Sequence, residues 1–483
     1  MSYPAKYPPA VNPENWNAMV DFFNGFTPEG IFKNPYDYMI VTDGTNYYAC
    51  NSYQIIFGGP DDAGGVDGED ANAVIKAVFA TADCVYLGPG IFEIDGTDMI
   101  TITRSMDVFG AGIGKTILKD MVGSTVEWFR VNASHVRIEG ITFDGNNLSK
   151  AMFHIKRHET DGDIFDIVIR DCQFTNMPTG HVAGGLVTVW DVEQKDLRLY
   201  DVTFDRCIFN NDPETTYDNV AVSYCKNVTF RDCYFDLSKV VILYNSEECR
   251  VIGCVFTGFS AFSNLVLGRR KHVVSGCLFS NPGVSVSLRI VSEGSDSGYH
   301  TISNNTFVGS YINLDDAAGS ISHVTIANNI FDTSASYAIG VAADVNAITD
   351  INIIGNSIND SVGHGIYVEA RAQRITITGN VLETIGTGPD AYKGIYLYQC
   401  TKCVVNSNCI RNPDSYGIYL NGATYNIIDG NQIVNSTSYA ILEAGAADYN
   451  IVSNNIAERA GSSTAITTIG AHSIEDNNIE IAS

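Results

Sequence analysis

The chain has 483 residues, and its 29 Lys and Arg against 55 Asp and Glu give a formal charge of −26. Only 17% of its residues are charged and 11% are aromatic, which excludes a disordered chain, because disorder goes with dense charge and few aromatic side chains. No apolar run approaches the ~18 residues that a membrane-spanning helix needs. Binding to phosphates requires clustered Lys and Arg. We therefore expect no membrane span and no nucleic-acid partner.

The first 60 residues differ in pattern from the rest of the chain. Asn12-Pro13 supplies the N-cap and first-turn chemistry of a short helix, whose apolar face holds Trp16, Val20 and Phe23. Residues 38–50 are predicted to form a hairpin about Asp43-Gly44. The sequence shows no secretory signal peptide. We assign residues 1–60 to a small module for attachment or oligomerisation, which is similar to the heads of phage and virus tail proteins, and residues 61–483 to a second domain.

Residues 61–483 are dominated by an internal repeat. Fourteen segments, from HVRIEGITF at 135–143 to HSIEDNNI at 472–479, align without gaps on one position. Every copy has Ile, Val or Phe three residues before this position, and Phe, Ile or Leu two residues after it. The aligned residues are, in order, Ile141, Cys172, Cys207, Cys233, Cys254, Cys277, Asn305, Asn329, Asn356, Asn380, Asn408, Asn431, Asn454 and Asn477.

A second apolar alternation lies between successive copies, and it is clearest in GIYVEA (365–370), GIYLYQ (394–399) and GIYLNG (417–422). Strands of period two that are separated by Gly, Asn, Asp and Ser turns cannot bury their apolar faces singly, but stacked units share a core. The repeats therefore predict a solenoid of about 14 coils. The aligned Asn amides are expected to bond along the column, and the five aligned Cys to be buried free thiols.

These repeats make the chain resemble the right-handed parallel β-helix, or pectate-lyase-like, superfamily over residues 60–483. The segment DANAVIKAVF (70–79), with an apolar stripe of Val74, Ile75, Val78 and Phe79, and the Gly-rich MDVFGAGIGKTILK (106–119) are also similar to that superfamily. The resemblance implies an all-β fold, a single-stranded right-handed parallel β-helix, with an N-terminal helix that caps the open end of the solenoid.

The outward positions of the second alternation hold the candidate binding residues. Aromatic rings in line, with cations beside them, suit a sugar chain. The expected substrate-binding residues are His154, Lys156, Trp190, Tyr367, Tyr396, Tyr398 and Tyr419. Gly363-His364-Gly365 is similar to a motif of polygalacturonase-like hydrolases, but the next coils have other residues at that place, which favours a turn without catalytic function.

The candidate catalytic residues are expected on the same face. Arg289 and Asp315 are predicted to lie in one outward column on adjacent coils, ~4.8 Å apart. The flanking candidates are Arg269, Glu369 and Tyr244. Two chemistries remain open. Asp315 and Glu369, ~9–10 Å apart, suit an inverting hydrolysis. Alternatively, arginines neutralise a uronate while Tyr244, Arg289 or Lys156 removes a proton in a β-elimination.

The function predicted first is an extracellular or virion-associated enzyme that degrades a polysaccharide, as a lyase or a glycoside hydrolase. It resembles phage-type tailspike depolymerases, whose manufacture in a reducing cytosol suits many free cysteines. The resemblance implies a homotrimer. Asp315 and Asp316 are candidate ligands of Ca²⁺, which would bridge an anionic polymer to this acidic chain. The alternative is a non-catalytic carbohydrate-binding adhesin or a structural fibre of a virion or cell surface.

Overall fold

The computed structural model describes residues 36–51, 55–59, 63–157, 162–177, 185–191, 197–210, 220–236, 240–243, 246–258, 263–280, 286–292, 296–315, 319–334, 336–343, 345–388, 391–458 and 465–481. The helix predicted from Trp16, Val20 and Phe23 lies outside these residues. The chain forms two compact units, residues 1–238 and 239–483, which are described separately. No helix in the described part of the chain is long and apolar enough to cross a membrane.

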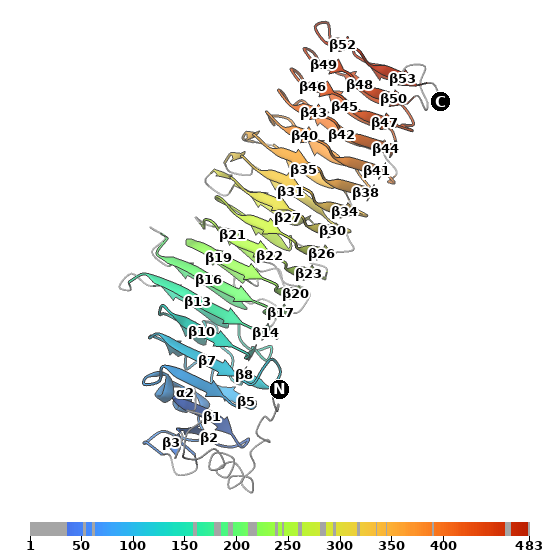
Figure 1. Cartoon of the computed structure of the whole chain (residues 1–483). Coiled ribbons are helices and arrows are strands. Elements are labelled where there is room, and N and C mark those ends of the chain that lie inside the picture. Colours follow the sequence, from blue (N-terminus) through green and yellow to red (C-terminus); the bar gives the residue numbers. More distant parts are fainter. Residues whose placement is uncertain are drawn as a thin grey trace, which may run out of the picture. The chain divides into compact units, whose positions relative to one another are not determined.

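The first unit is built from three sheets of parallel strands, A, B and C, which the chain visits in turn (Figure 1). Sheet A holds β4 (Cys84–Leu87), β7 (Met106–Gly110), β10 (Val136–Glu139), β13 (Ile164–Arg170), β16 (Leu199–Asp205) and β19 (Cys225–Arg231). Sheet B holds β5 (Gly90–Ile94), β8 (Thr116–Asp120), β11 (Thr142–Asp144), β14 (Gln173–Thr175), β17 (Ile208–Asn210) and β20 (Tyr234–Asp236). Sheet C holds β6 (Ile100–Ile102), β9 (Phe129–Val131), β12 (Phe153–Arg157), β15 (Val187–Asp191) and β18 (Val220–Ser223).

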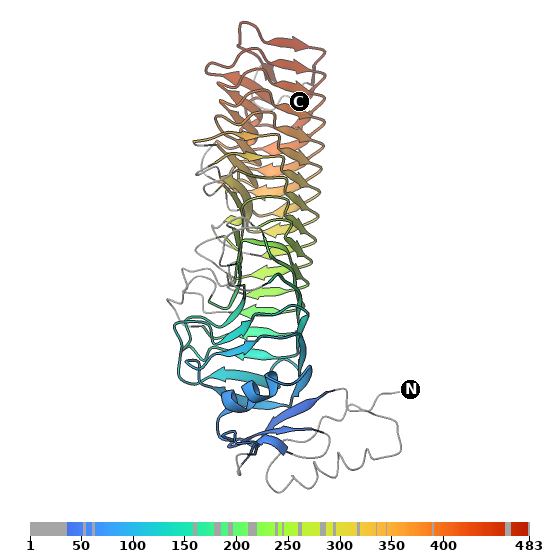
Figure 2. The same ribbon diagram turned by 90° about the vertical axis from the view of Figure 1, so that its left-hand side faces the viewer.

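The beginning of this unit has a different local structure. β1 (Tyr38–Thr42) and β2 (Tyr47–Cys50) form the predicted hairpin, β3 (Ile55–Gly58) pairs with β2, and β1 pairs in parallel with β4. Helix α2 (Ala71–Phe79) starts at Asp70, whose side chain accepts hydrogen bonds from the backbone N–H groups of Asn72 and Ala73. The apolar stripe predicted for this helix is buried, and the helix is visible beside the first strands in Figure 2.

The second unit repeats the same three sheets, with successive coils in register (Figure 2). Sheet A holds β22 (Arg250–Ile252), β25 (Val273–Ser275), β29 (Thr301–Ser303), β33 (Thr325–Ala327), β37 (Asn352–Ile354), β40 (Thr376–Thr378), β43 (Val404–Asn406), β46 (Ile427–Asp429), β49 (Ile451–Ser453) and β52 (Ile474–Asp476). Sheet B holds β23 (Val255–Thr257), β26 (Leu278–Ser280), β30 (Thr306–Val308), β34 (Ile330–Asp332), β38 (Ser357–Ser361), β41 (Val381–Ile385), β44 (Cys409–Pro413), β47 (Gln432–Val434), β50 (Ile456–Glu458) and β53 (Ile479–Ile481).

Sheet C of the second unit presents the longer strands. It holds β21 (Val240–Leu243), β24 (Leu265–Leu267), β27 (Val286–Val291), β31 (Tyr311–Asp315), β35 (Ile339–Ala342), β39 (Ile366–Val368), β42 (Lys393–Tyr398), β45 (Tyr416–Asn421), β48 (Ile441–Ala444) and β51 (Ile466–Thr467). A small sheet of β28 (Ser297–Gly298), β32 (Ile321–Ser322) and β36 (Ile348–Thr349) precedes sheet A in three coils. The expected parallel β-solenoid is confirmed. Each of the fourteen aligned segments forms a strand of sheet A that is followed by a strand of sheet B.

The corner between sheets A and B is filled by the aligned column. Asn305 Nδ2 donates to Asn329 Oδ1 at 3.0 Å and to Val274 O of the preceding coil at 3.1 Å. The same two bonds recur in the following coils to Asn455. In the earlier coils a thiol takes the place of the amide: Cys207 Sγ donates to Ile169 O of the preceding coil at 3.4 Å.

The alignment was wrong by one residue in the last two coils. The column there consists of Asn455 and Asn478, whereas Asn454 and Asn477 lie in the adjacent turn with φ of 56° and 54°. Both of these coils contain an Asn-Asn pair. The flanking isoleucines that fitted the pattern, such as Ile451 and Ile456, are partly exposed. The pattern therefore matched apolar residues that point outward.

The core is a set of side-chain stacks that run from coil to coil. The Phe residues that follow the corner lie on one another, with ring centroids 5.1 Å apart for Phe143 and Phe174 in the first unit and 4.8 Å apart for Phe279 and Phe307 in the second. The strand register pairs the members of each stack directly. Like residues in like positions thus bury the apolar face that a single coil would leave exposed.

None of the twelve cysteines, all of which lie in the described ranges, forms a disulfide bond, and the five in the predicted column are buried. We expect Cys172, Cys207, Cys233, Cys254 and Cys277 to remain thiols in the isolated protein, because each packs against backbone carbonyl oxygens. Alkylation of denatured, unreduced protein followed by peptide mapping should find all five modified. Two or more of them in disulfides would contradict this account of the corner.

A pair of stacked, buried histidines occupies the corner before sheet A. The rings of His272 and His300 lie 5.1 Å apart. Their Nδ1 atoms accept hydrogen bonds from Cys249 N and His272 N, both at 3.2 Å. At the same corner of later coils, the side chains of Asn426 and Asn450 accept hydrogen bonds from the backbone N–H groups of Cys403 and Asn426. Burial lowers the pKa of His272 to about 4, and burial together with His272 lowers the pKa of His300 well below its usual value.

This pair should make stability depend on pH. In the unfolded state His272 takes up a proton near pH 6.5, whereas in the folded state it does so only near pH 4. The free energy of unfolding is therefore at its full value above pH 6.5, and it decreases as the pH falls toward 4. The shift at His272 is equivalent to roughly 3 kcal/mol. Chemical unfolding of the wild type and of the His272→Asn/His300→Asn variant at pH 7.5 and 4.5 measures it. From pH 7.5 to 4.5 the free energy of unfolding should fall more in the wild type than in the variant. Equal decreases in the two proteins would contradict the assignment of this pH dependence to the histidine pair.

Candidate functional site

The outward face of sheet C in the second unit gathers most of the predicted site. Ile312, Leu314, Ile366, Val368, Ile395 and Leu397 point inward and are fully buried, as predicted. The residues between them therefore point outward. The strand register places these outward residues in one column: Arg289, Asn313, Gly340, Tyr367, Tyr396 and Tyr419.

The predicted register of Arg289 was wrong. Arg289 lies opposite Asn313, and Asp315 lies opposite Val291, so the predicted alignment of the two strands was wrong by two residues. Arg289 and Asp315 therefore belong to neighbouring columns. The two side chains nevertheless meet diagonally, and Arg289 Nη2 donates a hydrogen bond to Asp315 Oδ2.

Tyrosine rings form a continuous band along this face. Ring centroids are 5.0 Å apart for Tyr311 and Tyr337, 6.1 Å for Tyr337 and Tyr367, 5.3 Å for Tyr367 and Tyr396, and 5.2 Å for Tyr396 and Tyr419. We refer to these five residues as the tyrosine band. Its rings belong to five successive coils, those of β31, β35, β39, β42 and β45. Tyr398 adjoins it, 6.0 Å from Tyr396.

Tyr337 explains why the outward column contains a glycine. A Cβ atom on Gly340 would lie 2.2 Å from Cε2 of Tyr337, so only glycine leaves room for this ring above the strand. The Tyr337 hydroxyl donates to Asn313 Oδ1 at 3.1 Å. Burial raises the pKa of Tyr337, and Tyr311, Glu369 and Asp315 raise it further. The phenol therefore stays protonated and acts as a donor.

Two basic side chains border the band at its later coils. The ammonium group of Lys393 lies 5.3 Å from the ring centroid of Tyr396 and 5.5 Å from that of Tyr419. His364, set aside in the sequence as a turn residue, lies 5.1 Å from the ring of Tyr396, and its Nδ1 accepts a hydrogen bond from Lys393 N. Burial, reinforced by the charge of Lys393, lowers the pKa of His364 to about 4. The ring is therefore neutral near pH 7.

Carboxylates occupy the column beside the band. Asp315 lies opposite Ala342, and Glu369 follows β39 with its N–H bonded to Val341 O at 2.9 Å, which continues the same register. Two strand spacings separate Asp315 from Glu369, which gives ~9–10 Å. Burial and then the charge of Glu369 raise the pKa of Tyr367. This part of the face thus offers two carboxylates with protonated phenols between them.

The remaining predicted catalytic and metal residues are not brought into this group. Arg269 lies in the turn after β24 with φ of 62°, so it belongs to neither outward column. Tyr244 and Asp316 lie outside the described residues. Within the described ranges, no three His, Cys, Asp or Glu side chains gather as a metal site. The predicted Ca²⁺ pair therefore stays a prediction of the sequence.

The other predicted binding residues lie in the first unit. His154 and Lys156 on β12 pair in register with Thr188 and Trp190 on β15. Their nearest carboxylate is Glu127, which the sequence analysis missed. Glu127 lies before β9, outside the period-two pattern of the strands, so no periodic signal marks it.

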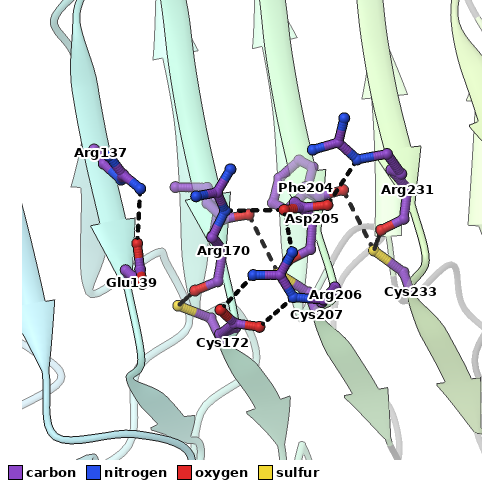
Figure 3. Close-up of polar contacts among 12 residues, drawn as sticks. Arg137, Glu139, Arg170, Cys172, Phe204, Asp205, Arg206, Cys207, Arg231 and Cys233 are labelled. Atoms are coloured by element: carbon purple, nitrogen blue, oxygen red, sulfur yellow. Dashed lines mark hydrogen bonds and ion pairs between the residues drawn. The ribbon is translucent and has the colours of Figure 1, made fainter. Parts of the chain in front are cut away.

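A polar network of the first unit lies on sheet A (Figure 3). Glu139, Arg170, Asp205 and Arg231 follow one another in one column with alternating charge. Asp205, only 1% exposed, accepts hydrogen bonds from Arg170, Arg206 and Arg231 at 2.8–2.9 Å. Burial would raise the pKa of Asp205, but the arginines, Arg231 foremost, lower it. Every charge in the column has an opposite neighbour, which indicates a structural role.

Comparison with known proteins supports the fold. The family model described as Periplasmic copper-binding protein (NosD) matches residues 372–482. The described residues of that range contain no group of three metal-binding side chains, so we derive no copper chemistry. No curated protein sequence matches the chain.

Solved structures of phage proteins are similar to the chain. A pentasaccharide complex of a tailspike mutant from E. coli bacteriophage HK620 has a TM-score of 0.53 at 13% identity, over 77% of this chain and 72% of that one. A double mutant of the same tailspike has a TM-score of 0.53 at 14% identity, over 84% and 74%. Tailspike protein 3 of bacteriophage CBA120 has a TM-score of 0.42 at 15% identity, over 98% and 67%. At these identities the likeness shows the fold alone: the chain is a parallel β-solenoid similar to tailspike proteins.

Proposed function

We propose that this chain is an extracellular or virion-associated protein that binds a polysaccharide along sheet C of its second unit and cleaves it. The observation that supports binding best is the tyrosine band. Sugar rings stack on aromatic faces, and the flanking phenols, amides and carboxylates suit hydroxyl groups. A band that crosses five coils offers successive contacts to a chain of sugars, whereas an isolated exposed ring would not.

For cleavage we favour hydrolysis over β-elimination. The distance inferred between Asp315 and Glu369 is near the upper edge of the ~6.5–9.5 Å found in inverting glycosidases. An elimination needs a free cation to neutralise a uronate and a base to remove a proton. Arg289 is already paired with Asp315, and burial keeps Tyr337 protonated. A glycoside hydrolase is therefore the first candidate and a lyase the second.

A non-catalytic adhesin or structural fibre is the alternative, and the ion pair of Arg289 with Asp315 favours it, because a paired carboxylate can serve structure alone. Two further parts of the proposal come from the resemblance to tailspikes and the β-helix superfamily. The protein is expected to assemble as a homotrimer, and α2 is expected to cap the first coils.

Substitutions on the face test the proposal once a substrate has been found in a polysaccharide panel. New reducing ends without absorbance at 235 nm report hydrolysis, and new reducing ends with absorbance at 235 nm report elimination. Asp315→Asn and Glu369→Gln should each lower turnover by about 100-fold or more, in keeping with the loss of an acid or base. Tyr396→Ala should weaken binding roughly tenfold through the loss of one stacking contact.

Asp350→Asn and Arg374→Ala are matched controls, because this ion pair lies on the side of sheet A with similar exposure. They should change neither binding nor turnover. If Tyr396→Ala weakens binding but no polysaccharide is cleaved by the wild type, the non-catalytic adhesin remains as the function. Full binding and turnover in all three face variants would overturn the proposal.

A further inference from the structure

A separate polar cluster lies on sheet C of the first unit. Glu127 is 5% exposed, and its Oε1 accepts hydrogen bonds from Arg130 Nε at 2.9 Å and from Lys156 Nζ at 3.3 Å. Its Oε2 lies 3.5 Å from Nδ1 of His154. The ammonium group of Lys156 also lies 5.4 Å from the centre of the Trp190 ring. We refer to these five residues as the Glu127 cluster.

The strand register brings these side chains to one outward patch. His154 lies opposite Arg130 on β9 and opposite Thr188 on β15, and Lys156 lies opposite Trp190. The residues that alternate with them on β12, Phe153 and Ile155, are buried in the core. The patch therefore results from the same alternation that exposes the tyrosine band.

The charges of the cluster do not balance. Burial alone would raise the pKa of Glu127, but contact with His154 and then Arg130 lowers it well below its usual range, so the carboxylate is ionised. In the described part of the chain it is the only carboxylate that pairs with Arg130, His154 or Lys156. Two permanent cations thus share one anion, although the whole chain has a charge of −26. A nearby buried pair, Arg157 with Asp191 at 2.9 Å, matches one cation with one carboxylate.

His154 is the second unexplained feature. The residue is 8% exposed; its Nδ1 faces Glu127 Oε2 at 3.5 Å, whereas its Nε2 has no hydrogen-bond partner among the described residues. Buried polar groups without a partner are rare, and each costs about 1–3 kcal/mol. Because Nδ1 faces Glu127, the buried Nε2 is the nitrogen that is left without a partner. A purely structural ion pair would leave this imidazole unexplained.

We propose that the Glu127 cluster is a second ligand site, for a sugar residue that carries an anionic group. The anionic group lies against Lys156 and Arg130, the sugar ring stacks on Trp190, and a hydroxyl group bonds to His154 Nε2. Glu127 is a positioning residue that holds the three basic side chains. The site differs in chemistry from the tyrosine band, where rings dominate.

Tryptophan fluorescence of the full-length protein tests the site. Of the three tryptophans, Trp16, Trp128 and Trp190, only Trp190 belongs to the Glu127 cluster, so it is the expected reporter. Glucuronate and glucose 6-sulfate are the probes, with glucose and inorganic sulfate as comparisons. A charged sugar should change the fluorescence saturably, and glucose should not. A response to only one of the two charged sugars would identify the anionic group as carboxylate or sulfate.

Variants decide whether the response comes from this site. Lys156→Gln and His154→Asn should each weaken binding by tenfold or more while the melting temperature stays near that of the wild type, and Trp190→Phe should abolish the signal. Lys76→Gln, which removes an exposed ion pair of the same unit, is the control. Tyr396→Ala should leave this binding unchanged, which separates it from the proposed function. Absence of any response to both charged sugars, or full binding by Lys156→Gln, would overturn the inference.

Discussion

The hydrogen bonds at the corner between sheets A and B are the constraint on which the rest of the structure depends. Each Asn of the column accepts a bond from the backbone N–H of its counterpart one coil earlier, as Asn329 does from Asn305 at 3.0 Å. Its Nδ2 also bonds to a carbonyl oxygen of that coil. In the coils that carry Asn, a corner without this side chain would leave backbone groups of the turn unsatisfied inside the core, which is costly. The column therefore sets both the turn and the register.

Register matters for function because side chains alternate between the two faces of a strand. A shift of one residue would exchange the buried Ile395 and Leu397 for Tyr396. The corner thus aligns the outward residues of sheet C, although it lies on a different side of each coil. The tyrosine band follows from this alignment, and it needs no special local structure beyond the glycine that admits Tyr337.

The sequence predicted the repeating architecture well because the repeat is a property of the core. In most coils the corner residue is Cys or Asn and the stacked residue after it is Phe, Ile or Leu, so their spacing is visible without coordinates. In Asn454-Asn455 the outward Ile451 and Ile456 made Asn454 fit the pattern, and the prediction was wrong by one residue. The register of Arg289 was also wrong, because the short alternating segments of β27 and β31 fit one another in more than one alignment, and the observed pairing differs from the predicted one by two residues.

The candidate sites were only partly predictable, since residues from turns complete them. Tyr337 precedes β35 and Glu127 precedes β9, so neither belongs to a periodic set. Gly340 was a usable signal: a glycine in an otherwise large outward column indicates that another side chain lies over it. The two sites also differ in character. The tyrosine band presents mainly rings and neutral donors, whereas the Glu127 cluster presents surplus positive charge beside one ring.

The central claim is that a polysaccharide lies along sheet C of the second unit, and tyrosine footprinting tests it most directly. Hydroxyl-radical labelling with and without a bound polysaccharide measures the protection of individual rings. Tyr425 and Tyr449 are an internal reference, because they are 55% and 44% exposed and stack on each other in the turns before sheet A. The account predicts protection of Tyr367, Tyr396 and Tyr419 with no change at the reference pair. Protection of Tyr425 and Tyr449 with none on the band would contradict it.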